Sequence, residues 1–465
     1  MSVAVKKVLV LLRTWNVLRL VPVLFMGALL LATFRLYKQS AYFWLDDFVN
    51  LGWAQQASFT QIVVYILNPL STPFRPVGML CYWLLLRCFD LNPAPYHWLA
   101  WSLHTANTAL VYFILKQLTK ARSGAAIGAM LFASQAAFSF IYWSFGTIFE
   151  LLAAFFSFAG LLLWTSERRN WSQVLFASLL LFLAMESKEM AVAMPLTWFI
   201  YDLIVREKKM DRQTFAHWIL PGGLALSYGL ARAFLMKGST PTHAYYLSIK
   251  GSTLISGLEI YSNMLFRTNF SVQIWCIAWL GCFLLVILLR SRPAFFFLSY
   301  VFVTFLPVIF LINHRFAFYW YLPFLGICGL AAMLVASIVC RIMARSQKSV
   351  WEAAAYSVFA LLCLGTFLFH EEITRRERLW AKQRADEYRA FVTGLQKLPP
   401  PPQGEVIYFD SQPSNFDPVC LLAATQVALR RTDVGAKLVS EFPAEAVYRL
   451  QFKGSQLRLL SSGNR

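Results

Sequence analysis

Two adjacent carboxylates, Asp46 and Asp47, are the side chains of this sequence best suited to acid–base chemistry. They follow the first long apolar run and are flanked by aromatic residues within Tyr42-Phe-Trp-Leu-Asp-Asp-Phe48. Acidic residues next to membrane-length apolar runs are costly to keep there and are frequently functional. One carboxylate can take a proton from an acceptor hydroxyl while the other positions that group or binds a metal ion. The structural alternative is helix capping, since Asp also favours the first turn of a helix.

Two arginines are candidates for binding a phosphate. Arg75 stands between prolines in Pro73-Phe-Arg-Pro76, where a restrained backbone suits a positioned anion contact. Arg315 follows His314 and precedes an aromatic stretch that ends at Pro323, a setting that suits an anionic lipid headgroup. The competing interpretations are a snorkelling interfacial arginine for the first and an aromatic belt for the second.

Two histidines, His97 and His104, lie seven residues apart, and Asn107 is three residues further, so the three share one helix face. Two histidines without a neighbouring acid are a weak signal for a metal site. Hydrogen bonding between helices is the favoured interpretation.

A charged tip, Met185-Glu-Ser-Lys-Glu-Met190, interrupts two apolar runs. It contains Glu186, Lys188 and Glu189, and Glu150 stands at the start of another apolar run. Such a tip is commonly a solvated turn. The charge pattern nevertheless predicts that Glu150 and the tip lie on the same membrane face as Asp46.

The composition indicates an integral membrane protein. Of the 465 residues, 58% are hydrophobic and 14% are charged, whereas soluble domains carry about 25% charged residues. The net charge of +19 resides in short basic clusters between apolar runs, which is the positive-inside pattern and does not indicate nucleic-acid binding. The eight cysteines form no C-x-x-C pair and are interpreted as small packing residues.

The apolar runs predict about eleven transmembrane helices. A first, uncleaved span is expected at about 17–36, followed by an outer loop over 38–75. Further runs lie at 77–91, 97–117, 124–141, 148–165, 171–184, 190–205, 216–235, 272–289, 294–311, 317–339 and 350–369. The basic clusters fall on one, cytoplasmic side if 77–91 is re-entrant or lies shallow in the membrane.

The end of the chain is more polar. The expected domains are a transmembrane domain over 1–370, a helical and proline-rich linker over 371–402, and a small extracytoplasmic α/β domain over 403–465. The four prolines 399–402 predict an extended break, and the alternating patterns at 405–409 and 446–452 predict strands.

Acid, cation and an apolar groove together suggest a lipid-phosphate substrate and a hydroxyl or amine acceptor. The sequence contains no P-loop, Rossmann fingerprint, H-E-x-x-H or G-x-S-x-G motif, so nucleotide-driven and serine-type chemistry are unsupported.

The order of short motifs over about 40–390 resembles the GT-C glycosyltransferases, close to the protein O-mannosyltransferase and tetratricopeptide-linked mannosyltransferase branch. The motifs are the acidic pair, Phe74-Arg-Pro76, Tyr96-His97 with His104, Trp143 and Gly146 before an acid, Ser187-Lys-Glu189, Tyr201-Asp202, and Arg315 before Tyr321-Leu-Pro323. No tetratricopeptide repeats follow the last apolar run.

The resemblance implies an all-α polytopic enzyme that transfers a sugar from a polyprenyl-phosphate donor, with inversion, to a glycan, lipid or protein acceptor. It implies a catalytic role for Asp46 or Asp47 and phosphate binding by Arg75 and Arg315, with Lys188 as a further donor-binding candidate. The supporting candidates are His97, His104, Glu150, Glu189 and His314. A divalent cation, Mg²⁺ or Mn²⁺, is left open, and the expected location is a bacterial inner membrane with the site and C-terminus periplasmic.

Two alternatives remain. A lipid-linked glycan flippase would carry acids within spans and internal repeats, and neither is evident here. An O-antigen ligase or polymerase would place its key loop late in the chain.

Overall fold

The computed structural model describes residue 27 and residues 41–68, 75–167, 169–207, 211–235, 240–288, 290–346, 349–443, 446, 448–453 and 456–462. The expected first span at 17–36 therefore lies outside the described residues, apart from Gly27. The chain forms two compact units, which are described separately. Unit 1 comprises residues 1–35, 102–138 and 150–373, and unit 2 comprises residues 36–101, 139–149 and 374–465.

Unit 1 is a helical bundle. It contains α6 (Pro93–Thr119) from Ser102 onward, α7 (Arg122–Ala133), α8 (Ile148–Trp164) from Glu150 onward, α9 (Trp171–Ser187), α10 (Met194–Ile200), α11 (Arg212–Leu235), α12 (Gly251–Phe266), α13 (Val272–Leu288), α14 (Arg292–Ile309), α15 (Phe324–Ser346) and the first part of α16 (Ser349–Gln396). Short helical turns η3 (Glu189–Ala193), η4 (Tyr201–Val205) and η5 (Ala317–Trp320) connect or extend them. Most predicted apolar runs are confirmed as helices, while α12 was not predicted.

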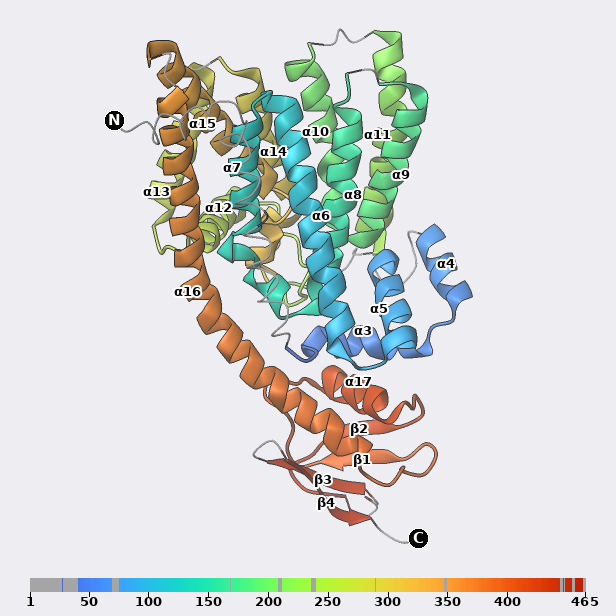
Figure 1. The fold of residues 1–465 in the computed structure, drawn as a ribbon. Helices are drawn as coiled ribbons and strands as arrows, with labels where there is room; N and C mark the ends of the chain where they lie inside the picture. The colour runs from blue at the N-terminus through green and yellow to red at the C-terminus, as the bar shows by residue number, and fades with distance from the viewer. Residues whose placement is uncertain are drawn as a thin grey trace, which may run out of the picture. The chain divides into compact units, whose positions relative to one another are not determined.

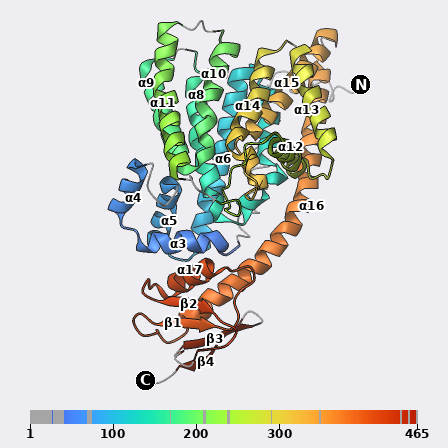
Figure 2. The same cartoon turned by 180° about the vertical axis from the view of Figure 1, so that it is seen from behind.

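Small residues let the central helices of this bundle pack closely. α15 packs against both α7 and α14; Figure 1 labels all three helices, and Figure 2 shows α14 and α15 from behind. A Cβ added at Gly124 would lie 2.5 Å from the carbonyl oxygen of Ala332, and one at Gly128 would lie 2.8 Å from that of Cys328. Such close approach of backbones is typical of helices that associate in lipid, where small side chains line the interface.

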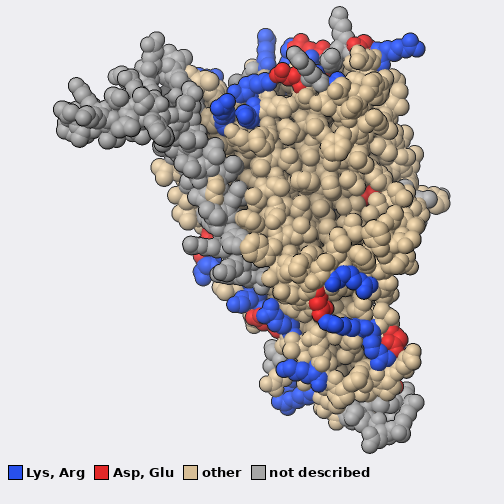
Figure 3. Space-filling model, turned by 45° about the vertical axis from the view of Figure 1, so that its right-hand side comes forward, with Lys and Arg blue, Asp and Glu red and all other residues tan. Residues whose placement is uncertain are grey.

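Two described helical stretches, Phe145–Trp164 and Arg292–Ile309, are long and apolar enough to cross a membrane. Several other apolar helices are shorter, so the number of crossings stays a prediction. Figure 3 shows a broad face of unit 1 that is almost free of charged side chains, with charges gathered at one end of it. Large apolar side chains such as Leu230, Ile277 and Leu288 are exposed, which suits a lipid environment.

Unit 2 contains the acidic pair. The expected outer loop over 38–75 is partly helical, with α3 (Leu45–Gln56) and α4 (Phe59–Leu67), and α5 (Pro76–Phe89) follows. Ser58 caps α4 by accepting a hydrogen bond from the Gln61 N–H, while the Gln61 side chain accepts from the Ser58 N–H. The start of α6 and the short turns η1 (Ala136–Tyr142, from Ser139 onward) and η2 (Phe145–Thr147) complete this part.

The C-terminal part of unit 2 is a small α/β fold, as the sequence predicted. Its four-stranded sheet has the order β2-β1-β3-β4, formed by β1 (Val406–Phe409), β2 (Gly435–Leu438), β3 (Tyr448–Lys453) and β4 (Gln456–Ser462). β1 pairs in parallel with β2 and β3, and β3 pairs antiparallel with β4. Figure 1 shows α17 (Pro418–Leu429) over this sheet, and α17 also packs on α3. The predicted strands correspond to β1 and β3, whereas β2, β4 and α17 were not predicted.

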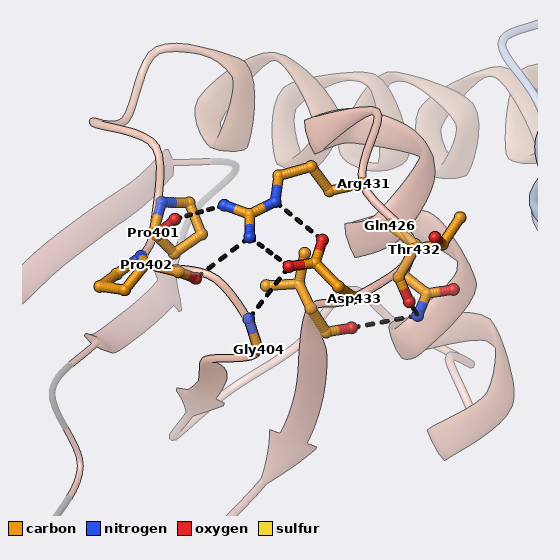
Figure 4. Close-up of polar contacts among 8 residues, drawn as sticks. Pro401, Pro402, Gly404, Gln426, Arg431, Thr432 and Asp433 are labelled. Atoms are coloured by element: carbon orange, nitrogen blue, oxygen red, sulfur yellow. Dashed lines mark hydrogen bonds and ion pairs between the residues drawn. The ribbon is translucent and has the colours of Figure 1, made fainter.

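The proline-rich segment is anchored to this fold by one arginine. α16 ends at Gln396, before the four prolines, and Arg431 then donates hydrogen bonds to the carbonyl oxygens of Pro401 and Pro402 (Figure 4). Asp433 binds the same guanidinium and accepts a hydrogen bond from Gly404 N–H at 3.0 Å. The ion pair with Arg431 lowers the pKa of Asp433 well below its usual range.

Candidate active site

The two neighbouring acids have opposite environments in the first turn of α3. Asp46 is exposed, whereas Asp47 is buried, with 1% of its surface accessible. Asp47 is the third residue of the helix, and its side chain accepts a hydrogen bond from the N–H of the capping residue Trp44 at 2.7 Å. The capping role that the sequence offered as the alternative is therefore present in Asp47.

Asp47 also accepts a hydrogen bond from the Tyr82 hydroxyl of α5 at 2.6 Å. Burial raises the pKa of Asp47 to about 7, although the hydrogen bonds from Tyr82, Trp44 and the Gly146 backbone oppose that rise. The negative charge of Asp46 adds to it. A carboxyl group that changes charge near neutral pH can hold or release a proton under physiological conditions.

Residues of another predicted motif meet this acid within unit 2. The ring of Trp143 packs edge to face on Trp44 at 4.9 Å, and a Cβ on Gly146 would lie 3.5 Å from Asp47 Oδ1. The sequence named both residues only as part of the motif order that resembles the GT-C glycosyltransferases. The structure brings them to the acidic pair about one hundred residues earlier in the chain.

Arg75 begins α5 in an unusual backbone conformation. Its φ of 126° lies where glycine is favoured, and the rigid Pro76 follows it as the first residue of the helix. The half-buried guanidinium lies 5.5 Å from the centre of the Phe149 ring. Phe149 is held close against Gly78, where an added Cβ would lie 2.2 Å from the ring. Backbone strain of this kind is concentrated at functional sites.

His97 has a structural contact in unit 2. It is buried, and its Nε2 lies 2.9 Å from the carbonyl oxygen of Ala41. This contact ties α6 to the segment that leads into α3.

In unit 1, contacts with Tyr319 link Glu150 and Lys188 to His314. The Lys188 Nζ lies 2.6 Å from Glu150 Oε1, and both side chains are 5% exposed. The same ammonium lies 5.3 Å from the Tyr319 ring, and the Tyr319 hydroxyl lies 2.5 Å from His314 Nδ1. His314 in turn stacks on Tyr245 at 4.6 Å. Three predicted site residues thus form one connected cluster.

The charged tip is not a solvated turn. Glu186 and Lys188 are buried, and Glu189 is half-buried. Glu186 faces Arg232 of α11 at 3.8 Å, so two ion pairs hold this tip inside the bundle. Charges buried in this way need such partners.

Arg315 adjoins His314 and contacts α12. Its Nη1 donates to Ser256 Oγ at 3.0 Å and its Nε to the Leu311 carbonyl at 2.8 Å. Arg315 is half-buried. Arg315 belongs to unit 1 and Arg75 to unit 2.

His104 and Asn107 make the interhelical hydrogen bonds that were favoured over metal binding. His104 Nδ1 lies 2.8 Å from the Tyr321 hydroxyl, and the Asn107 amide donates to the same oxygen at 3.2 Å. The other His104 nitrogen lies 3.3 Å from the Ala133 carbonyl. Among the described residues, no three His, Cys, Asp or Glu side chains gather as a metal-binding set.

Three site neighbours were not identified from the sequence. Tyr82 and Tyr319 lie in aromatic-rich stretches that gave no reason to select one ring over another. Arg232 could have been selected from the sequence, because a lone arginine in an apolar run needs a partner.

Comparison with known proteins identifies the fold. No family model and no curated protein matches the sequence. Among solved structures, the chain is similar to ArnT from Cupriavidus metallidurans bound to undecaprenyl phosphate, with a TM-score of 0.53 and 12% identity over 90% of this chain and 86% of that one. The apo state of the same protein gives a TM-score of 0.47 at 12% identity over 95% and 87%. The chain thus shares the fold of ArnT.

Proposed function

We propose that this chain is an integral membrane glycosyltransferase that transfers a sugar from a polyprenyl-phosphate donor to a hydroxyl or amine acceptor. The observation that carries the proposal is the shared fold over 90% of the chain with ArnT, whose structure holds undecaprenyl phosphate. The acid pair of α3 offers the carboxylates that such chemistry needs. The proposed location is a bacterial inner membrane, with the site and C-terminus periplasmic.

In this proposal the accessible Asp46 is the general base and Asp47 is its positioning neighbour. The acceptor oxygen or nitrogen forms a bond to the anomeric carbon and loses its proton to Asp46. The bond between that carbon and the phosphate oxygen breaks, its electron pair stays with the lipid phosphate, and the configuration inverts. Asp47 suits the positioning role because its carboxylate already accepts hydrogen bonds from Tyr82 and Trp44.

The leaving phosphate needs charge stabilisation more than it needs a proton. Arg75 and Arg315 are the proposed phosphate-binding cations, since a guanidinium can contact two phosphate oxygens at once. Lys188 is the third, although its pairing with Glu150 reduces the charge that it can offer. Mg²⁺ or Mn²⁺ would be held by one or two carboxylates together with the substrate phosphate, and no step of the proposal depends on it.

The test uses the purified protein in vesicles with a labelled polyprenyl-phosphate sugar in the outer leaflet. Formation of a labelled acceptor product together with free lipid phosphate supports the transferase. A flippase would move the intact donor to the inner leaflet and leave its sugar–phosphate bond unbroken. That outcome would replace the proposal with the transporter alternative.

A further inference from the structure

An open cavity of about 310 Å³ lies in unit 1, apart from the candidate site residues. Its apolar lining comes from the turn η4 and from α13 and α14, and consists of Ile204, Val286, Ile287 and Phe295. The rest of its lining is Arg290 and Ser291 of the connection between α13 and α14, and Arg292, the first residue of α14. One cavity thus combines an apolar wall with two cations.

Arg290 is the more available of the two cations. It is exposed and makes no ion pair with any acidic side chain among the described residues, and its backbone has a left-handed φ of 47°. Arg292 is paired with Glu207, and both side chains are more than half exposed. Ser291 caps α14 by accepting a hydrogen bond from the Ala294 N–H, so the positive end of the helix dipole adds to the two guanidinium groups.

The surface beside the cavity is apolar. Ile287 is 47% exposed and Leu288 is 78% exposed. A free inorganic anion would gain nothing from such a wall, whereas an acyl chain would be buried by it. Arg290 and Arg292 form a basic cluster between the apolar runs 272–289 and 294–311, and the charge pattern predicts that such clusters are cytoplasmic, opposite to the predicted face of Asp46.

We propose that this cavity binds an anionic glycerophospholipid of the cytoplasmic leaflet. Arg290 and Arg292 bind its headgroup phosphate, and Ile287 and Phe295 contact the first carbons of an acyl chain. Glu207 competes with the phosphate for Arg292. This binding is independent of sugar transfer and is measured without a sugar donor.

The first test measures lipid retention by native mass spectrometry of the full-length protein in detergent, with phosphatidylglycerol or phosphatidylcholine added. We expect phosphatidylglycerol to be retained about tenfold more than phosphatidylcholine, and Arg290→Gln and Ile287→Trp to remove most of this preference. Arg212→Gln is the matched control, because Arg212 is exposed, belongs to the same predicted side and does not line the cavity. Equal loss in R290Q and R212Q would overturn the site.

The second test uses a substitution that should increase lipid retention. Glu207→Gln frees Arg292 and should increase retention of phosphatidylglycerol several-fold. Glu167→Gln changes the net charge equally, at an exposed ion pair with Lys120 that is not part of the cavity, and should leave retention unchanged. Equal gains in E207Q and E167Q would show that lipid retention depends only on the net charge of the protein. Full displacement of the lipid by millimolar inorganic phosphate would show a site for any small anion. Either result would contradict the proposal.

Discussion

Lys188 and Glu150 form a buried ion pair, with 2.6 Å between Nζ and Oε1. The two residues come from the end of α9 and the start of α8, and the pair lies against the ring of Tyr319. Two charges that are each 5% exposed depend on one another, because removal of either leaves the other buried without compensation.

We therefore predict that Lys188→Met and Glu150→Gln each lower the free energy of unfolding by about 3–5 kcal/mol, the typical cost of breaking a buried pair. The double variant should recover much of that loss. Thermal unfolding in detergent measures both effects. The exposed pair Lys120–Glu167 is the control, and its disruption should cost less than about 1 kcal/mol. Single variants of the buried pair that unfold like the wild type would show that the pair does not stabilise the bundle.

A second prediction concerns pH. The pKa of Asp47 is about 7 in the folded protein and near 3.8 when the chain is unfolded. Between these values the folded state binds the extra proton, so stability is highest below about pH 4 and decreases as the pH rises to 7. Asp47→Asn should abolish this part of the decrease, and Asp46→Asn should retain most of it. An unfolding midpoint in D47N that follows pH as in the wild type would contradict the assignment.

A third prediction concerns the packing that holds Arg75. Gly78→Ala places a methyl group 2.2 Å from the Phe149 ring and must displace it. We expect a lower unfolding midpoint and partial rescue by the double variant Gly78→Ala with Phe149→Leu. Gly223→Ala is the control, since its Cβ would meet nothing within 4 Å, and it should be neutral or slightly stabilising in its helix. Equal midpoints for G78A and G223A would refute the tight contact.

A fourth prediction concerns the proposed donor cations. Arg75→Gln and Arg315→Gln should each raise the KM for the lipid-phosphate donor by roughly tenfold to a hundredfold, the loss expected for one charge-assisted hydrogen bond. Arg212→Gln should leave it unchanged. Kinetics at saturating acceptor make the measurement. Unchanged donor KM values in both variants would remove these residues from the donor site.

Much of the fold could be predicted from the sequence, because apolar runs of bilayer length have few possible structures. The strands at 406–409 and 448–453 were identified from their alternation, and α16 from its charged continuation. α12 was missed because its polar residues, including Glu259, lower its hydropathy. The burial of Glu186 and Lys188 was missed because their partners, Arg232 and Glu150, lie 46 and 38 residues away in the chain.

The acid pair shows where sequence reasoning ends. Asp46 and Asp47 are identical in type and adjacent, so composition and spacing could not separate them. Their difference arises from helical geometry, which turns Asp47 toward Tyr82 and leaves Asp46 exposed. Only the fold could separate the two carboxylates by their burial and hydrogen bonding.

The most direct test of the central claim is the release of polyprenyl phosphate from a labelled polyprenyl-phosphate sugar by purified Asp46→Asn protein. We predict a loss of at least about a hundredfold, as expected for a general base, with an unchanged unfolding midpoint and unchanged donor binding. Near-normal release by D46N would contradict the account.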